Sequence, residues 1–332
     1  MLLPNSDTDF VLLDGGTELP AELRGAIIVI GNFDGVHAGH RVILQHAIDL
    51  AAGAVPVLAL TFEPHPRTVF NPSNPVFRLS PKLEKASLLR ACGLSGVLNW
   101  QFSREFAALS AQTFVEDILI TYLAASHVVV GYDFHFGRGR EGSPAFLFAA
   151  GQSAGFGVTV VPQVTLPDGL AVSSSAIRDH LMKADIRAAN NELGYRWFVQ
   201  AEVIHGEKRG RQLGYPTANM KLSPHCRLAL GIYAVSVRRQ NGTLHHGVAS
   251  YGRRPQFDNG AALLEAYLFD FSDDLYGETL MVTFHDFLRG EARFDGVDAL
   301  VAQMDNDSAR ARQILQAARP LSPLDARLSF QP

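Results

Sequence analysis

The residues best suited to chemistry lie in one glycine-rich string, GNFDGVHAGH, at residues 31–40. Its two histidines, His37 and His40, are three positions apart, so on the first turn of a helix they share a face. Imidazoles at a helix N-terminus can donate hydrogen bonds to phosphate oxygens and stabilise charge that develops at phosphorus. The glycines let the backbone approach a phosphate closely. We therefore predict that this histidine string binds the phosphates of a nucleotide. No side chain of the string needs to be a nucleophile, because a phosphate of a second substrate can attack the nucleotide directly.

Two other interpretations of the histidine string stay open. A His-x-x-His pair can be half of a zinc site, although no third ligand stands at a suitable local spacing. A strand-to-helix turn that binds nothing is the second alternative. The complete string is more specific than a lone glycine turn, and it favours the phosphate site.

Aromatic and polar residues follow two further apolar runs. Asp133 and Phe134 lie just beyond the apolar run at residues 127–131. Phe134 and Phe136 alternate with polar residues. Their rings could flank a flat ligand or fill the core. His65 stands between two prolines, either in a rigid binding loop or in a solvated turn.

Hydroxyl groups gather before a predicted helix at residues 174–183. Ser174 and Ser175 could hold an anion at the start of that helix, with Arg178 adding a charge-assisted bond. Simple capping of the helix beside a surface arginine is the alternative.

A second string, GEKRGRQLGYPTAN, occupies residues 206–219. Its three glycines and three basic residues suit a nucleoside triphosphate, although a solvated surface loop is also possible. Thr217 and Asn219, at its end, offer hard oxygen ligands two residues apart, as Mg²⁺ prefers. Further along, Glu265 interrupts an apolar strand pattern, where a carboxylate is costly unless it has a partner. It is either a general base or a structural carboxylate.

The elements that must position these groups change character along the chain. In the first half, apolar runs predict strands and apolar residues three and four apart predict helices. The predicted strands are residues 26–30, 55–62, 96–100, 127–131 and 158–161, and the predicted helices are residues 42–50, 81–90, 112–124, 144–150 and 174–183. This alternation predicts a parallel sheet covered on both faces, with Ser80 as a cap of the second helix. The histidine string would then lie at the carboxyl edge of the sheet, where ligands of such folds bind.

The second half is dominated by strand patterns. The predicted strands are residues 197–205, 231–239, 243–251, 263–271 and 279–288. Asn241-Gly242 between two of them predicts a type I′ hairpin turn. These features favour an antiparallel barrel or sandwich, joined to the first half by a short helix near residues 184–195. Two helices are expected at the end, at residues 296–303 and 308–318.

Composition narrows the class of protein. The 332 residues suggest about two domains, and 47% hydrophobic with 19% charged residues excludes a largely disordered chain. The net charge of −4 argues against a general nucleic-acid binder. Two distant cysteines, Cys92 and Cys226, indicate a reducing compartment, and we expect the cytoplasm. An acidic N-terminus does not match a secretory or mitochondrial signal, and no run of about 20 apolar residues predicts a membrane helix.

The histidine string resembles GxFDGxHxGH, the motif of the HxGH nucleotidyltransferases, and in particular the FMN adenylyltransferase half of bifunctional riboflavin kinase/FMN adenylyltransferases. TFEPHP at residues 61–66, GYDFHFG at 131–137 and SSSAIR at 173–178 resemble later motifs of that family in the same order. The resemblance implies that His37 and His40 are catalytic. It implies ATP binding by Gly31, Phe33, Asp34, Gly35, His37, His40, Ser174, Ser175 and Arg178, and flavin binding by Phe62, His65, Pro66, Asp133 and Phe134.

The second string resembles the riboflavin kinase motif G(x)GRxLGxPTAN, and LEAYLFDF at residues 264–271 resembles a later strand of that family. The resemblance implies that Glu265 is the general base for the ribityl 5′-hydroxyl of riboflavin. It implies ATP binding by Gly206, Lys208, Arg211, Gly214, Thr217 and Asn219, Mg²⁺ binding by Thr217 and Asn219, and flavin binding by Arg289 and Phe294. Ser250, Gln256 and Tyr267 depart from the family pattern, which has Asn, Thr and His there.

We therefore expect an α/β plus β chain with two activities. Residues 1–184 would form a Rossmann-like nucleotidyltransferase domain, and residues 185–332 an antiparallel β-barrel kinase domain with terminal helices. The barrel would convert riboflavin and ATP to FMN, and the sheet domain would convert FMN and ATP to FAD and pyrophosphate, with Mg²⁺ serving both steps. The rival hypotheses are an enzyme with one degenerate domain and a flavin-binding regulatory or storage protein. The expected partners are small molecules, with no nucleic acid and no membrane.

Overall fold

The computed structural model describes residues 10–163, 172–206, 214–253 and 262–330, and these form two compact units. The sheet unit contains the described residues up to Val76 and those from Ser80 to Ser173. The barrel unit contains Phe77–Leu79 and the described residues from Ser174 onward. The functional boundary between residues 184 and 185 stays a prediction.

The sheet unit is built on a six-stranded, wholly parallel sheet with the strand order β1-β4-β3-β2-β5-β6. The strands are β1 (Val11–Asp14), β2 (Ile27–Ile30), β3 (Val57–Glu63), β4 (Gly96–Gln101), β5 (His127–Gly131) and β6 (Gly157–Val161). The chain passes from β2 to β3 and β4 on one side and later reaches β5 and β6 on the other. The strand order therefore reverses between β2 and β5, and ligands of open α/β sheets bind at the carboxyl ends of the strands at such a reversal.

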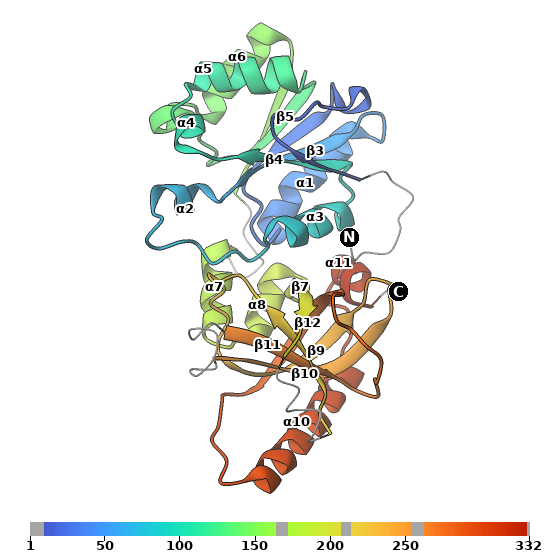
Figure 1. The fold of residues 1–332 in the computed structure, drawn as a ribbon. Helices are drawn as coiled ribbons and strands as arrows, with labels where there is room; N and C mark the ends of the chain where they lie inside the picture. The colour runs from blue at the N-terminus through green and yellow to red at the C-terminus, as the bar shows by residue number, and fades with distance from the viewer. Residues whose placement is uncertain (1–9, 164–171, 207–213, 254–261, 331–332) are drawn as a thin grey trace. The chain divides into compact units, whose positions relative to one another are not determined.

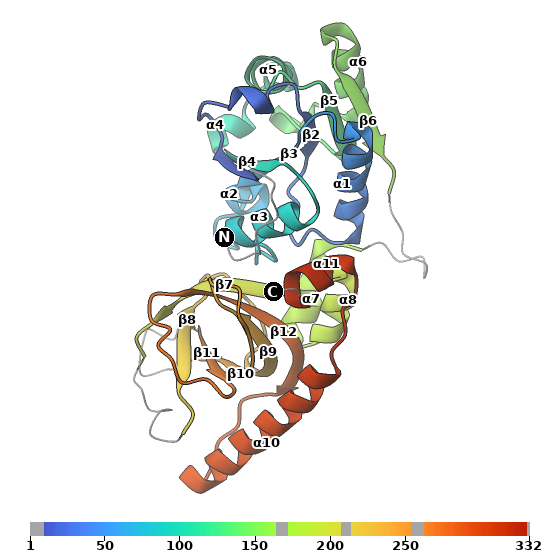
Figure 2. The same ribbon diagram turned by 90° about the vertical axis from the view of Figure 1, so that its right-hand side faces the viewer.

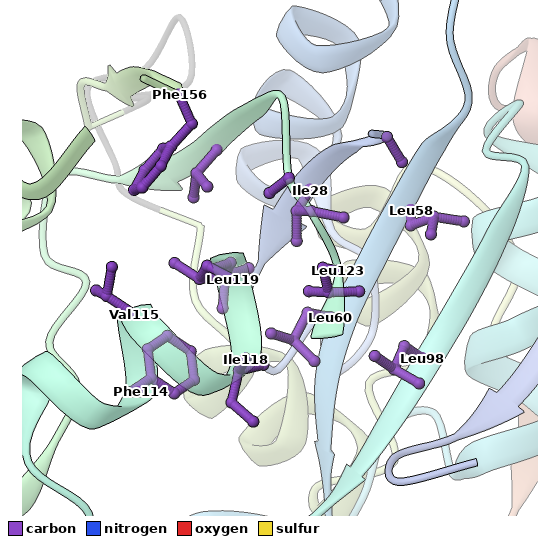
Figure 3. Close-up of a cluster of buried hydrophobic side chains, with 14 of the residues drawn as sticks. Ile28, Leu58, Leu60, Leu98, Phe114, Val115, Ile118, Leu119, Leu123 and Phe156 are labelled. Carbon is purple, nitrogen blue, oxygen red and sulfur yellow. The ribbon is translucent and has the colours of Figure 1, made fainter. Parts of the chain in front are cut away.

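Helices cover both faces of the sheet, as expected around a central strand such as β2, which is apolar and buried throughout (Figure 1). They are α1 (Ala38–Ala51), α2 (Pro66–Phe70), α3 (Lys82–Ala91), α4 (Arg104–Ala107), α5 (Ala111–Thr113), the π-helix η2 (Phe114–Tyr122) and α6 (Pro144–Ala154). On one face, η2 presents Phe114, Ile118 and Leu119 to Ile28 and Leu60 of the sheet (Figure 3). This packing fixes the sheet whose edge carries the histidine string.

The barrel unit is a closed, six-stranded antiparallel barrel with the order β10-β11-β8-β7-β12-β9. The strands are β7 (Phe198–Ile204), β8 (Thr217–Lys221), β9 (Gly231–Arg238), β10 (Leu244–Arg253), β11 (Ala262–Leu268) and β12 (Thr279–Arg289). The class of fold expected for each half is thus confirmed. Two strands escaped the sequence analysis, β8 because it ends a glycine-rich string and β1 because it is a four-residue edge strand. Both are defined by ladders with distant strands rather than by their own pattern.

The helices of the barrel unit are α7 (Ser174–Met182), α8 (Ile186–Leu193), α10 (Val297–Ala317), α11 (Pro323–Asp325) and the π-helix η5 (Ala326–Phe330). The prediction of two helices after residue 296 is wrong, because α10 runs unbroken through Asp305 and Asp307 (Figure 2). Tyr215 donates a hydrogen bond to Asp305, and Arg289 forms an ion pair with Asp307. These contacts hold α10 to the barrel at the point where its sequence indicated a break.

The hairpin between β9 and β10 also differs from expectation. A type I′ turn needs positive φ at two residues, but only Gly242 of the Asn241-Gly242 pair has one, at 88°. Gly242 N–H donates to Arg239 O at 3.0 Å, and Arg239 N–H donates to Thr243 O at 2.9 Å. The connection is therefore a three-residue loop with the glycine in the left-handed position, and the Asn241 side chain accepts from the Thr243 N–H.

A short segment between α2 and α3 belongs to the barrel unit because of two contacts. The Trp197 indole N–H donates to Leu79 O at 2.8 Å, and Arg178 Nε donates to Phe77 O at 2.6 Å. The rings of Phe77 and Trp197 also pack edge to face, 6.1 Å apart.

Among the described residues, no helix has the length and apolar character needed to cross a membrane.

Candidate active sites

The histidine string turns sharply between β2 and α1. Phe33, Gly35 and Val36 all have positive φ, at 45°, 85° and 37°, although only glycine adopts that region freely. The Phe33 ring folds back over Gly31, where an added Cβ would lie 3.0 Å from the ring. Such strain persists only where the surroundings hold it, and it tends to occur at functional sites. This turn brings His37 to the start of α1 as its N-cap residue.

Ser80 holds the strained turn from outside the string. Its Oγ accepts a hydrogen bond from Gly35 N–H at 2.7 Å, and its own N–H donates to Asp34 Oδ1 at 3.0 Å. The prediction that Ser80 caps helix α3 is therefore wrong, since Pro81 occupies that position without a side-chain cap. Asp34 and Phe33 are both buried, so the ATP contacts predicted for them would come from their backbone rather than their side chains.

The structure brings His37 and His40 together. Their rings stack with centroids 3.7 Å apart, and Phe33 packs edge to face against His40 at 5.4 Å. Burial, followed by the neighbouring His37, lowers the pKa of His40 well below its usual value. Two cationic rings at this distance would repel, and this lowered pKa favours the uncharged form of His40 at neutral pH. The Nδ1 atom of His40 is buried and has no hydrogen-bond partner within the part of the chain that the structure describes.

A buried lysine beside this turn escaped the sequence analysis. Lys85 of α3 is 1% exposed, and its ammonium donates to Thr61 Oγ1 at 2.8 Å and to Glu63 Oε1 at 3.0 Å. Both partners lie on β3, at the carboxyl edge of the sheet. Its position one turn before Leu88 and Leu89, on the buried face of α3, was the available signal.

The residues predicted to bind flavin in the sheet unit have mixed surroundings. Phe62 is packed among Phe102 and Phe106, and Phe134 stacks on Phe136 at 5.4 Å, so both contribute to the core. Asp133 is exposed in the turn that follows β5, and β5 is the strand that pairs with β2. Asp133 therefore reaches the solvent at the reversal point.

Two neighbouring residues on the way out of β3 are also fixed. The His65 ring is buried and accepts a hydrogen bond from Arg67 N–H at 3.1 Å, and Pro66 starts α2. His65 thus caps this short helix. The remaining predicted ATP ligands, Ser174, Ser175 and Arg178, lie on α7 in the barrel unit, so their part in the adenylyltransferase site stays a prediction.

In the barrel unit, the candidate kinase residues gather on one face of the wall. Asn219 of β8, Glu265 of β11 and Ser250 of β10 lie directly opposite one another across three adjacent strands. Thr217 and Tyr267 form the next pair on the same face, two residues along. Glu265 is only partly buried, so its carboxylate can reach a substrate.

Asn219 has the surroundings of a ligand. Its Nδ2 donates to Thr217 O at 3.1 Å, whereas its buried Oδ1 has no partner among the residues that are described. An added Cβ at Gly206 would lie 2.5 Å from this amide, so a larger residue there would displace the Asn219 side chain. Gly214 has a φ of 81°. Lys208, Arg211 and Gln256 lie outside the described residues.

The two residues predicted to bind flavin in the barrel unit, Arg289 and Phe294, lie against each other near α10. The guanidinium of Arg289 forms a forked ion pair with Asp307 of α10, with N–O distances of 2.8–3.1 Å, and it lies over the Phe294 ring at 5.6 Å. Arg289 thus secures α10 to the barrel. Tyr267, in place of the usual His, packs against Tyr215 with ring centroids 4.7 Å apart. Burial and Asp305 raise the pKa of Tyr215 to about 12.

The fold and both sites define a two-part, ATP-dependent transferase, with a nucleotidyltransferase-type sheet and a kinase-type barrel. Comparisons with known proteins agree. The family model for FAD synthetase matches residues 19–176, and that for riboflavin kinase matches residues 193–315. The bifunctional riboflavin kinase/FMN adenylyltransferase of Escherichia coli (strain K12) is 37% identical over 301 residues, which cover 90% of this chain and 96% of that protein. Its counterpart in Pseudomonas fluorescens is 41% identical over 308 residues, covering 91% and 97%.

A solved structure is similar over nearly the whole chain. The crystal structure described as a macrolide-efflux protein from Streptococcus pneumoniae has a TM-score of 0.79 and 29% identity, covering 93% of this chain and all of that one. The chain belongs to the bifunctional riboflavin kinase/FMN adenylyltransferase family. It is an enzyme that phosphorylates riboflavin to FMN and adenylylates FMN to FAD, with ATP as the donor.

The Ser80 contacts predict a selective defect. Ser80→Ala removes the acceptor of the Gly35 N–H and should lower the free energy of unfolding by about 1–3 kcal/mol. It should also slow FAD formation from FMN more than it slows riboflavin phosphorylation. Ser143→Ala is the control, because it removes a helix cap worth about 0.5–2 kcal/mol, far along the chain from the histidine string. Equal losses of both activities in Ser80→Ala would contradict a role in the turn.

Proposed function

We propose that His37 and His40 are the catalytic pair of the adenylyltransferase and that Glu265 is the general base of the kinase. The observation that carries the first assignment is the stack of the two imidazoles at the N-terminus of α1, where the strand order reverses. The register of Asn219, Glu265 and Ser250 across the barrel wall supports the second.

In the sheet unit, ATP binds with its phosphates at the start of α1. The backbone N–H groups there and the positive end of the helix dipole hold the phosphate charge. The phosphate of FMN attacks the α-phosphorus of ATP, the new P–O bond forms, and the bond to the β-phosphate breaks to release pyrophosphate. His37 and His40 donate hydrogen bonds to the oxygens on which charge accumulates. The phosphate of FMN is already ionised, so no side chain has to remove a proton.

In the barrel unit, the reaction does require a base. The 5′-hydroxyl of the ribityl chain attacks the γ-phosphorus of ATP while Glu265 accepts its proton, and ADP leaves. The partial burial of Glu265 on an otherwise apolar strand keeps the carboxylate in place beside Asn219. The FMN formed here is the acceptor for the reaction of the sheet unit.

Mg²⁺ fits the donors of the barrel wall. The buried Asn219 Oδ1 without a described partner, next to Thr217, is a hard oxygen of the kind that Mg²⁺ prefers. Thr217 and Asn219 would hold the ion together with the ATP phosphates. When bound, Mg²⁺ neutralises phosphate charge and draws electrons from the leaving group. We assign Mg²⁺ to both reactions.

We also place the enzyme in the cytoplasm. Its two cysteines, Cys92 and Cys226, are far apart in the sequence and make no Cys-x-x-Cys pair, which is typical of a chain from a reducing compartment.

The adenylyltransferase assignment predicts a loss confined to one activity. His37→Ala/His40→Ala should lower FAD formation from FMN and ATP by at least roughly 10²–10³-fold, the worth of one such donor. Riboflavin phosphorylation, measured on the same sample, should stay at the wild-type rate. His46→Ala is the control, since this exposed histidine lies on the same helix. FAD formation at the wild-type rate in the double variant would overturn the assignment.

The kinase assignment predicts the reciprocal defect. Glu265→Gln keeps the size of the side chain but removes the base, so riboflavin phosphorylation should fall by roughly 10²–10⁴-fold. Binding of riboflavin and ATP, measured by calorimetry, should change far less, and FAD formation from added FMN should not change. Glu202→Gln is the control, because Glu202 is an exposed carboxylate on strand β7 of the same barrel. A kinase rate near wild type would mean that Glu265 has only a structural role.

The metal assignment predicts an altered Mg²⁺ requirement. Asn219→Ala should raise the Mg²⁺ concentration for half-maximal kinase activity by at least about tenfold, because even outer partners of a metal ion are worth that much. The exposed Asn191→Ala should leave it unchanged. The measurement is the initial rate of riboflavin phosphorylation against Mg²⁺ at fixed ATP. An unchanged requirement would remove Asn219 from the metal site.

A further inference from the structure

Lys85 stands out among the charged groups that the two reactions leave unassigned. Burying an ammonium is strongly unfavourable unless it is paired and hydrogen-bonded. Lys85 meets that condition with one carboxylate, Glu63 at 3.0 Å, and one hydroxyl, Thr61 at 2.8 Å. An apolar side chain could have filled the space between α3 and the sheet without this cost. Packing alone therefore does not explain why a charged residue occupies this position.

The hydroxyl of Thr61 connects the lysine to the histidine string. Because an ammonium can only donate, Thr61 Oγ1 must accept from Lys85, and the single hydroxyl proton is left to point elsewhere. It is donated to the backbone carbonyl of Asn32, 3.2 Å away. Asn32 directly precedes Phe33, the first strained residue of the turn. The lysine thus orients a hydrogen bond that holds the backbone where it leaves β2.

The lysine also acts on the histidines through its charge. The charged and titratable groups that face His40 are His37, Asp34, Lys85 and Arg41. After burial and His37, the positive charges of Lys85 and Arg41 lower the pKa of His40, while Asp34 opposes them. The charge on Lys85 therefore favours the neutral His40 ring.

We infer that Lys85 is a positioning residue for adenylyl transfer, which sets the turn between β2 and α1 through Thr61 and Asn32 and so places His37 and His40 against the phosphates. The inference rests on the role proposed for these two histidines. Lys85 acts through these residues and does not itself contact the substrate. An ion pair that serves only to join α3 to β3 is the alternative.

The first test removes the charge in the full-length enzyme. Lys85→Met should lower kcat for FAD formation about tenfold to a hundredfold, the effect of a misplacement near 1 Å, and should change KM for ATP much less. Kinase activity of the same sample reports whether the barrel unit is folded, and the dispersion of the NMR signals of the sheet unit reports whether that unit is folded. Lys82→Met is the matched control, because Lys82 lies on the same helix but is exposed and pairs with Asp14 at the surface. Wild-type kcat in Lys85→Met would overturn the inference.

Two readouts separate positioning from a structural role. The pKa of His40, followed by NMR of the ring protons, should rise in Lys85→Met because a nearby positive charge is gone, and should stay unchanged in Lys82→Met. Thr61→Val breaks the link to Asn32 and should lower kcat while leaving the ion pair intact, and Thr61→Ser should restore the rate. A Thr61→Val variant with wild-type kcat, or a His40 pKa that does not move in Lys85→Met, would leave only the structural ion pair.

If Lys85→Met does not fold, Lys85→Met/Glu63→Gln removes both charges and takes its place in the same assays. Lys85→Arg keeps the positive charge, and we expect it to retain part of the rate of FAD formation. If this variant forms no FAD while its kinase stays active, the electrostatic effect of Lys85 on His40 is contradicted. The histidine variants distinguish the two possible failures. If His37→Ala/His40→Ala still forms FAD, the proposed site is wrong. If that variant is inactive while Lys85→Met is fully active, only the inference about Lys85 fails.

Discussion

The sharp turn between β2 and α1 is the constraint on which the adenylyltransferase site depends. Two bulky residues, Phe33 and Val36, hold positive φ there, and each such residue costs about 1–3 kcal/mol. The turn is fixed from three directions: by the ring of Phe33 over Gly31, by Ser80 on Gly35 and Asp34, and by Thr61 on the Asn32 carbonyl. In return, α1 begins with two stacked imidazoles at its N-terminus. A relaxed turn would begin the helix elsewhere and move the two rings away from the carboxyl edge of the sheet.

The two units solve the same problem, holding ATP phosphates, by different means. In the parallel sheet, all strands end at one edge, so loops and a helix N-terminus meet there and the backbone supplies much of the binding. In the closed antiparallel barrel, strand ends alternate, and the proposed site lies instead on side chains that share a face of the wall, as Asn219 and Glu265 do. Helix α10 is held against this barrel, because Tyr215 and Arg289 bond to its acidic residues.

Local motifs were enough to propose the chemistry, because each motif lies within one short stretch of the sequence. The spacing of His37 and His40, the Thr217–Asn219 pair and the lone carboxylate of Glu265 could each be recognised within one stretch of chain. The alternation of strands and helices, followed by hairpins, likewise predicted the two fold classes, which depend on the period of apolar residues. The roles proposed for these side chains remain predictions that the variants above test.

What only the tertiary structure decided depends on residues far apart in the chain. Ser80 and Lys85 follow the histidine string by some 45 residues, yet parallel-sheet folding brings them against it, and neither has a local signal beyond helix periodicity. Helix α10 is continuous because Tyr215 and Arg289 bond to Asp305 and Asp307, and β1 and β8 are strands because partners complete their ladders. The ion pair that Arg289 forms with Asp307 of α10 had no signal in the sequence either. The sequence alone determined which groups are present and which periods they follow, whereas long-range hydrogen bonds and ion pairs decided where each group lies.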